Sequence, residues 1–209
     1  MTFALTNPEN ADLCDFSKSQ WYTPPELAER IVDWALSIWA NDRLSVLEPS
    51  CGRGALVRAL RMRGAHVMGF DIDPANIVHC WDRWQDDACF YTANFLDQDA
   101  TLYINAPLDL AVMNPPFEDG AAEAHIAHAL TFAPRVVAHV PLTTLAGKDR
   151  REGLWSSAYL KRLVIHSTRP KYSGSRTGGM TDMCTIDVVR RSERVDCVRA
   201  SGVEVAWWP

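Results

Sequence analysis

Apolar and polar positions follow two different spacings in successive segments of the chain. Short apolar runs, typical of buried strands, lie at 44–47, 66–70, 88–92, 108–113 and 135–140. Segments with the spacing of amphipathic helices lie at 26–40, 54–62, 74–84 and 121–132. Strands that alternate with helices predict β-α-β units, and therefore a parallel sheet covered by helices on both faces.

Two more strands are expected near the end of the chain, at 162–166 and 181–190, with a Gly/Ser-rich segment between them. Such a pair favours an antiparallel hairpin at one edge of the sheet. The predicted fold class is α/β, with a doubly wound, mostly parallel sheet of seven strands and a C-terminal antiparallel hairpin. Because 209 residues form one core of ordinary size, we expect a single domain over 1–209, with an irregular segment at 1–20 and substrate-facing insertions at 143–185.

The composition is that of a globular protein in a reducing compartment. Hydrophobic residues make up 47% and charged residues 22% of the chain, and no apolar run approaches the ~18–20 residues that cross a bilayer. The N-terminus has no basic stretch, so we expect no signal peptide, no membrane partner and a cytoplasmic location in a bacterium or a phage-infected host cell. The six cysteines and six histidines show no metal-ligand spacing, so we expect reduced thiols and no metal.

Charge is unevenly distributed along the chain. Over 143–176 eight basic residues face two acidic ones, so this segment is formally +6 while the whole chain is −5. A local basic face on an acidic body can bind the phosphates of a nucleic acid. An ordinary solvated surface is the alternative interpretation of the same charges.

The turn between the first predicted strand and the next helix has the character of a cofactor loop. It begins at Glu48 and contains Gly52 and Gly54, which allow the backbone to approach a ligand closely. The third glycine of a phosphate-binding loop is missing, and an acid at the start disfavours phosphate. The loop instead suits a ligand that carries ammonium and sulfonium charges.

Polar residues also follow the second and third predicted strands. Asp71 ends the second strand, 19 residues after Gly52, where a carboxylate can accept both hydroxyl groups of a ribose. Asn94 follows the third strand, where its amide can bind the edge of an adenine, and Phe95 can stack on the ring. Separately these residues would form an ordinary turn, helix cap and loop, but together they favour a nucleoside site.

The run Asn114-Pro115-Pro116-Phe117 ends the apolar strand at 108–113 and carries the most information about chemistry. Both prolines fix φ at about −65°, and neither donates a hydrogen bond. The Asn114 side-chain oxygen and the Pro115 carbonyl can then accept two hydrogen bonds from one planar NH₂ group, with the Phe117 ring beside it. This run predicts a site that holds an exocyclic amine while it reacts.

Together these segments resemble the class I S-adenosylmethionine-dependent methyltransferases, specifically the N6-adenine DNA methyltransferases of the Asn-Pro-Pro-Phe type with a gamma-like motif order. The resemblance covers roughly residues 20–190 and rests on the stretches QWYTPPELAERIVDWA, VLEPSCGRG, GFDIDP, AVMNPPF and RVVAHVPLTTL, and on a late aromatic motif at 169–172. It implies a Rossmann-like class I fold, S-adenosyl-L-methionine as the cofactor and DNA as the partner.

The resemblance also assigns residues to the cofactor. Thr23 would contact its methionine end, Glu48 and the glycine loop its amino and carboxylate groups, and Asp71 its ribose. Ile72 would lie against the adenine ring, and Asn94 stands where relatives often have Asp to hold the adenine amine. The full cofactor set is Tyr22, Thr23, Pro24, Glu48, Pro49, Cys51, Gly52, Gly54, Asp71, Ile72, Asn94, Phe95 and Asn114.

The target base would lie beside the catalytic run, Asn114, Pro115, Pro116 and Phe117. Phe117 would stack on the base, and Tyr172 would form a second aromatic wall. Because a paired base cannot reach such a site, the target adenine is expected to be flipped out or single-stranded. The basic residues expected to contact flanking phosphates are Lys148, Arg150, Arg151, Arg169, Lys171 and Arg176.

Other substrates and roles stay open at this point. No separate target-recognition domain fits after the predicted hairpin, so relaxed or short-sequence specificity and a phage or prophage origin are favoured over recognition by the 143–185 insertions or by a partner. The same tetrapeptide serves methyltransferases of RNA adenine N6, RNA guanine N2 and protein glutamine, although the upstream Thr-Pro-Pro favours DNA. A catalytically inactive partner subunit is the non-enzymatic alternative, and the oligomeric state is unknown.

Overall fold

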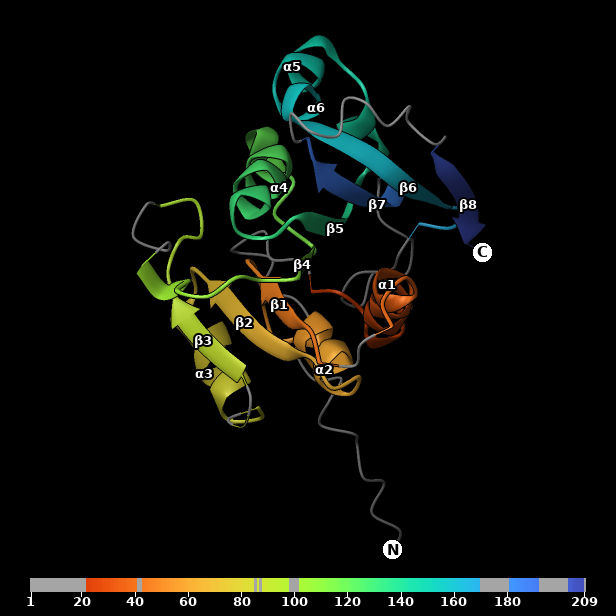
Figure 1. The fold of residues 1–209 in the computed structure, drawn as a ribbon. Helices are drawn as coiled ribbons and strands as arrows, with labels where there is room; N and C mark the ends of the chain where they lie inside the picture. Colours follow the sequence, from red (N-terminus) through yellow and green to blue (C-terminus); the bar gives the residue numbers. More distant parts are fainter. Residues whose placement is uncertain are drawn as a thin grey trace, which may run out of the picture.

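The computed structural model describes residues 22–40, 43–84, 86, 88–97, 102–169, 181–191 and 203–208. These residues form one sheet of eight strands in the order β3-β2-β1-β4-β5-β7-β6-β8 (Figure 1). The strands are β1 (Ser45–Glu48), β2 (His66–Asp71), β3 (Ala88–Thr92), β4 (Leu110–Met113), β5 (Arg135–Pro141), β6 (Ala158–His166), β7 (Met183–Arg190) and β8 (Glu204–Trp208). The helices are α1 (Pro25–Leu36), α2 (Ala55–Arg61), α3 (Pro74–Trp81), α4 (Ala121–Phe132), α5 (Lys148–Glu152) and α6 (Leu154–Ser157), with 3-10 helices η4 (Glu118–Gly120) and η5 (Leu142–Leu145).

Most of the sheet is parallel. Strands β3, β2, β1, β4 and β5 run parallel to one another, so their carboxyl ends meet at one edge of the sheet. β7 runs antiparallel between β5 and β6, which confirms the predicted C-terminal hairpin. The predicted α/β class with a mostly parallel sheet is therefore confirmed.

The prediction of seven strands was wrong, because β8 adds an eighth beside β6. It pairs in parallel, with Arg162 opposite Glu204 and His166 opposite Trp208. A short edge strand has a weak periodic signal, and its partner lies far away in the sequence. Other boundaries also differ from the predicted ones: α1 ends at Leu36 instead of near residue 40, and β6 begins at Ala158 instead of 162.

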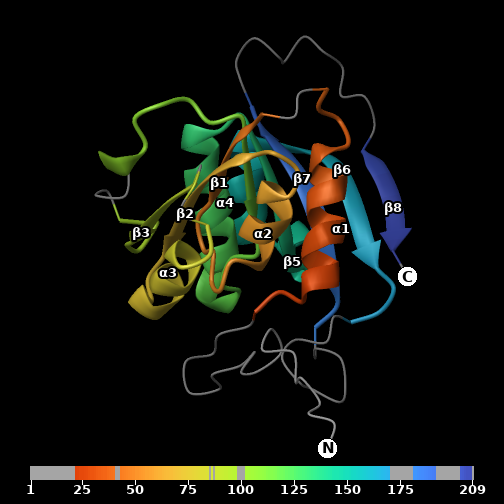
Figure 2. The same ribbon diagram turned by 90° about the horizontal axis from the view of Figure 1, so that it is seen from below.

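Alternate residues of the strands face two different helix layers. In β4, Leu110 and Val112 pack with α1, α2 and α3, whereas Ala111 and Met113 pack with α4 and α6. In Figure 2, α1 and α2 lie in front of the sheet and α4 lies behind it. All four side chains are fully buried, and a buried Leu, Val or Met contributes about 1.5–3 kcal/mol to stability.

A charged cluster is buried between α1 and the hairpin. Asp187 is fully buried and accepts hydrogen bonds from Nε of Arg162 at 2.5 Å and from Nε of Arg135 at 2.6 Å. The Arg162 guanidinium also lies 4.1 Å from the ring centroid of Trp34 in α1. Because Arg162 is only 6% exposed, one of the eight basic charges in 143–176 belongs to the core and not to a basic face.

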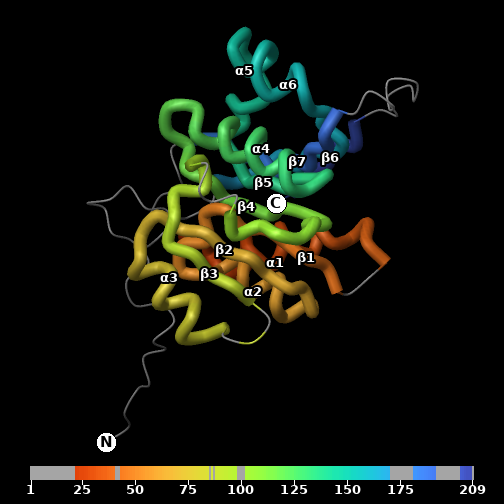
Figure 3. The backbone as a smooth tube through the Cα atoms, turned by 60° about the vertical axis from the view of Figure 1, so that its left-hand side comes forward, coloured from red at the N-terminus to blue at the C-terminus, as the bar shows by residue number. Residues whose placement is uncertain are grey.

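The edge where the parallel strands end is the part of the fold that matters for function. The turns after β1, β2, β3 and β4 leave the sheet there, and residues 22–24 reach it from the start of α1. The segment that contains α5 and α6 lies beside α4, away from α1, α2 and α3 (Figure 3). Among the described helices, none has the length and apolar character needed to cross a bilayer.

Candidate active site

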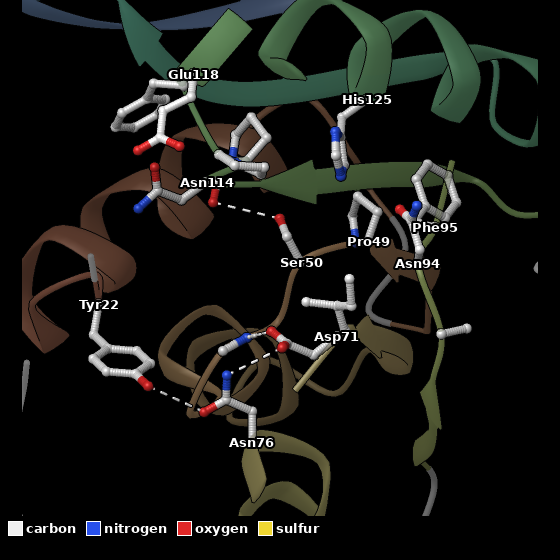
Figure 4. A pocket seen from close by; sticks show the side chains of 16 residues that line it. Tyr22, Pro49, Ser50, Asp71, Asn76, Asn94, Phe95, Asn114, Glu118 and His125 are labelled. Carbon is white, nitrogen blue, oxygen red and sulfur yellow. Dashed lines mark hydrogen bonds between the residues drawn. The ribbon is translucent and has the colours of Figure 1, made fainter. Parts of the chain in front are cut away.

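A cavity of about 350 Å³ lies at the edge where the parallel strands end (Figure 4). It is formed by the end of β2 and the turns after β1, β2, β3 and β4, by one residue before α1, and by one residue each of α3, η4 and α4. Its lining residues are Tyr22, Pro49, Ser50, Gly52, Asp71, Ile72, Asn76, Ala93, Asn94, Phe95, Asn114, Pro115, Pro116, Phe117, Glu118 and His125. A cleft of this size at the carboxyl ends of the strands is typical of a small-molecule site in α/β proteins.

The carboxylate of Asp71 is the centre of a hydrogen-bond network on one side of the cavity. Its Oδ2 accepts from the backbone N–H of Gly52 at 2.8 Å, and its Oδ1 accepts from the backbone N–H of Asp73 at 2.9 Å and from Nδ2 of Asn76 at 3.1 Å. The Tyr22 hydroxyl donates to Oδ1 of Asn76 at 3.2 Å. Since a carboxylate has about four acceptor sites, roughly one remains for a ligand hydroxyl.

Two glycines shape the turn after β1, but only Gly52 lines the cavity. Gly52 has a φ of +52°, and a Cβ there would lie 3.3 Å from Cδ1 of Tyr22. Gly54 has a φ of +81°, and a Cβ there would collide with the ring of Trp84. Gly52 therefore lets the backbone approach the cavity beside Tyr22, whereas Gly54 lets the turn pack against Trp84.

Glu48 and Cys51 lie in the core beneath this turn and do not line the cavity. Oε1 of Glu48 accepts from the backbone N–H of Ser50 at 3.2 Å, and burial raises the pKa of the Glu48 carboxyl well above its usual range. A hydrogen bond with Cys80, together with burial, raises the pKa of the Cys51 thiol. Of Glu48, Pro49 and Cys51, which were all predicted to contact the cofactor, Pro49 lines the cavity.

Asn114, directly after β4, brings a buried acceptor to another wall of the cavity (Figure 4). Its Nδ2 donates to Oγ1 of Thr23 at 2.9 Å, whereas its Oδ1 is buried and has no hydrogen-bond partner among the described residues. The Ser50 hydroxyl donates to the Asn114 backbone carbonyl at 3.4 Å. A buried acceptor without a hydrogen-bond partner lowers stability by about 1–3 kcal/mol. When such an acceptor lies on a cavity wall, it indicates a place where a donor group of a bound ligand would form the missing hydrogen bond.

The rest of the tetrapeptide continues along the same wall. Pro115 is buried, Pro116 is exposed, Phe117 is half-buried, and all three line the cavity. The two prolines remove two backbone donors beside Asn114, so these positions cannot satisfy its free oxygen. The structure thus brings the four predicted catalytic residues together at one cavity.

The residues predicted for the adenine side lie on the turns after β2 and β3. Ile72 is 71% exposed and presents an apolar surface to the cavity. Oδ1 of Asn94 accepts from the Leu96 N–H at 3.2 Å, and its Nδ2 donates to Oδ1 of Asp97 at 3.0 Å, so this amide is used within its own turn. Phe95 is only 1% exposed, so its ring belongs mainly to the core.

Sequence reasoning missed five residues that line the cavity, namely Ser50, Asn76, Ala93, Glu118 and His125. Asn76 lies five residues after Asp71, and only the fold shows that its amide turns back to that carboxylate. Glu118 directly follows the catalytic run, so its position could have been inferred. The Nδ1 of His125 donates to the Ala121 carbonyl at 2.8 Å, and burial lowers the pKa of the His125 ring.

The basic residues predicted to contact DNA do not line the cavity where the structure describes them. Lys148, Arg150 and Arg151 belong to α5, and Arg169 lies beyond β6. Three of them form ion pairs, which are Arg150–Glu123, Arg151–Glu152 and Arg169–Asp182. Lys171, Tyr172 and Arg176 lie outside the described residues. Within the described part of the chain, no cluster of His, Cys, Asp and Glu could hold a metal ion.

The strand order, the antiparallel β7 and the cavity at the carboxyl ends define the Rossmann-like fold of the class I S-adenosylmethionine-dependent methyltransferases. No family model matches the sequence. Solved structures agree on the fold at low sequence identity. A proposed class I S-adenosylmethionine-dependent methyltransferase from Listeria monocytogenes is 14% identical with a TM-score of 0.67, over 93% of this chain and 69% of that one.

Two further solved structures share the fold at similarly low sequence identity. A proposed RNA methyltransferase from Pyrococcus horikoshii is 16% identical with a TM-score of 0.66, over 84% of this chain and 87% of that one. A modification subunit of a proposed type I restriction enzyme from Vibrio vulnificus is 14% identical with a TM-score of 0.61, over 84% of this chain. The match spans 45% of the Vibrio subunit, so less than half of that protein is represented here.

Proposed function

We propose that this protein transfers a methyl group from S-adenosyl-L-methionine to the N6 amino group of adenine in DNA, with relaxed or short-sequence specificity. The observation that carries the proposal is Oδ1 of Asn114, a buried acceptor that lacks a partner among the described residues on a cavity-lining side chain. An exocyclic NH₂ group would supply the missing donor. The resemblance of AVMNPPF to the catalytic loop of N6-adenine DNA methyltransferases favours adenine.

Residues of the cavity fit the proposed cofactor. Asp71 has about one acceptor site left for a ribose hydroxyl, Ile72 offers an exposed apolar surface to an adenine ring, and Gly52 lets the backbone come close. Among the described residues, the lining includes the acids Asp71 and Glu118 and no lysine or arginine, which suits a cationic ligand. When bound, the cofactor supplies a methyl group made electrophilic by its sulfonium centre.

The protein's own contribution is to make the amine nucleophilic. The N6 lone pair of adenine is delocalised into the ring and reacts poorly. If Oδ1 of Asn114 and the carbonyl of Pro115 each accept one N–H, the nitrogen is drawn toward tetrahedral geometry and its lone pair is freed. Because positive charge then develops on the nitrogen, both hydrogen bonds stabilise the transition state more than the ground state.

Positioning supplies the other part of the proposed mechanism. Phe117 offers a ring on which the target base can stack beside Asn114, and holding both reactants in one cavity lowers the entropic part of the barrier. Tyr172, outside the described residues, stays the proposed second aromatic wall. An adenine in a duplex would have to be flipped out to reach Asn114, at a cost of a few kcal/mol.

Two observations besides the tetrapeptide favour DNA as the substrate. The fold is similar to that of a protein named as a restriction-enzyme modification subunit, and basic residues lie on α5 beside α4. RNA is the second candidate, because the fold is also similar to that of a protein named as an RNA methyltransferase, with a TM-score of 0.66 against 0.61 for the restriction-enzyme subunit.

The test is transfer of tritium from methyl-labelled cofactor to unmethylated plasmid DNA, structured RNA and a mixed protein substrate. We expect label in DNA, and N6-methyldeoxyadenosine after enzymatic digestion to nucleosides. Label in RNA alone would replace the first candidate with the second. Asn105→Ala, at an exposed position outside the cavity lining, serves as a control variant that should methylate like the wild type.

A further inference from the structure

Thr23 and Asn114 lie 91 residues apart in the sequence and are joined by a hydrogen bond in the structure. Oγ1 of Thr23 accepts from Nδ2 of Asn114 at 2.9 Å. Thr23 is 8% exposed and does not line the cavity, so its contact with the site runs through the Asn114 side chain. Thr23 therefore contacts the residue that would bind the target amine without lining the cavity itself.

The start of α1 holds Thr23 in place. Pro24 and Pro25 directly follow it and fix their own φ angles, and α1 is anchored by fully buried residues such as Ile31 and Val32. Thr23 is therefore a fixed acceptor and not a mobile surface hydroxyl.

The orientation of the Asn114 amide decides what the cavity offers to an amine. A side-chain amide can turn by about 180° and exchange its oxygen for its NH₂ group. In the structure the NH₂ end is bound to Thr23, and Oδ1 is the end without a partner among the described residues. An NH₂ group facing the cavity could not accept a hydrogen bond from an amine.

We propose that Thr23 is a positioning residue: by accepting a hydrogen bond from Nδ2 of Asn114, it keeps the amide oxygen available for the N–H of the target amine. This inference rests on the proposed function. It adds a residue that the reaction requires but that does not itself contact the reacting atoms. It differs from the role in which Thr23 contacts the methionine end of the cofactor. The two roles predict different effects on cofactor affinity.

The experiment compares Thr23→Val, which keeps the branched shape but has no oxygen, with Thr23→Ser, which keeps the hydroxyl. The matched control is Thr131→Val, at an exposed threonine in α4 whose hydroxyl donates to the His128 carbonyl of the same helix. Three quantities are measured: kcat on DNA, cofactor affinity by calorimetry, and the side-chain NH₂ signals of Asn114 in a ¹H–¹⁵N spectrum, assigned with Asn114→Ala.

Thr23→Val should lower kcat roughly 10–100-fold, as loss of a residue that orients a reactive group typically does. Cofactor affinity should stay within a few-fold, the Asn114 NH₂ signals should shift, and Thr23→Ser and Thr131→Val should resemble the wild type. Unchanged NH₂ signals in Thr23→Val would overturn the inference, as would a loss of cofactor affinity as large as the loss of kcat. If the wild type methylates no DNA, the proposed function fails, while the NMR comparison still decides the role of Thr23.

Discussion

The side chain of Asp71 and the backbone of Gly52 are joined by a 2.8 Å hydrogen bond that ties the end of β2 to the turn after β1. One carboxylate therefore has two functions. It fixes the conformation of the glycine turn, and it presents its remaining acceptor capacity to the cavity. Any change at Asp71 should affect both the shape of the cofactor side and its ability to bind a ribose.

Asp71→Ala should weaken binding of S-adenosylmethionine about 10–100-fold or more, because a charge-assisted acceptor and the support of Gly52 are lost together. Asp71→Asn keeps one oxygen acceptor and should lie between Asp71→Ala and the wild type. Isothermal titration calorimetry of the three proteins gives the affinities. Wild-type affinity in Asp71→Ala would place the cofactor somewhere other than beside β2.

Gly54→Ala should destabilise the protein more than Gly120→Ala. Both glycines have nearly the same positive φ, +81° and +79°, which costs an alanine roughly 1–2 kcal/mol. A Cβ at Gly54 would also collide with Trp84, whereas nothing lies within 4 Å of a Cβ at Gly120. The collision adds about 1–3 kcal/mol. Urea denaturation of both variants measures the difference, and equal free energies of unfolding would contradict the packing role of Gly54.

The contribution of His166 to the free energy of unfolding should fall as the pH drops from about 6.5 to about 4. Burial, with a smaller effect of the nearby Arg30, lowers the pKa of His166 from 6.5 to about 4, and burial also lowers the pKa of His139 beside it. The unfolded chain therefore binds more protons than the folded one in this range, so the stabilisation is complete above it and is lost within it. Denaturation of His166→Asn over the same range should give a shallower slope than the wild type. Identical slopes would remove His166 as a source of the pH dependence.

Arg169→Ala should weaken DNA binding and reduce the slope of log affinity against log salt by about one. Arg58→Ala is a matched control, because Arg58 and Arg169 are both partly exposed and both form 2.9 Å ion pairs with acids. Arg58 belongs to α2, in the opposite helix layer from α4. Fluorescence anisotropy at several salt concentrations measures both slopes. Equal slopes in the two variants would mean that bound DNA does not contact Arg169 after β6.

The sequence predicted those features that depend on neighbours along the chain. Alternating strands and helices gave the parallel sheet, and strand ends placed Asp71 and Asn114 at one edge, because their positions follow from the topology alone. The burial of Glu48 was not predictable in the same way. Its charge suggested a ligand contact, whereas its place at the end of β1 puts the side chain under the turn.

Contacts between residues that are far apart in the sequence could not be predicted from it either. Tyr22 and Asn76 are 54 residues apart, and Thr23 and Asn114 are 91 apart, yet each pair is hydrogen-bonded. No local spacing distinguishes these pairs from other polar residues, since the contact exists only once α1 has docked on the sheet. The short strand β8 was missed for the same reason.

The most direct test of the central claim is to remove the Asn114 amide and measure binding and chemistry separately. Single-turnover methyl transfer to DNA and cofactor affinity by calorimetry are compared for the wild type, Asn114→Ala and the control Asn105→Ala. We predict that Asn114→Ala lowers the transfer rate by at least about 100-fold, as loss of a hydrogen bond made in the transition state does, while its cofactor affinity changes by no more than a few-fold. Transfer by Asn114→Ala at the wild-type rate would show that the amide oxygen does not activate the amine.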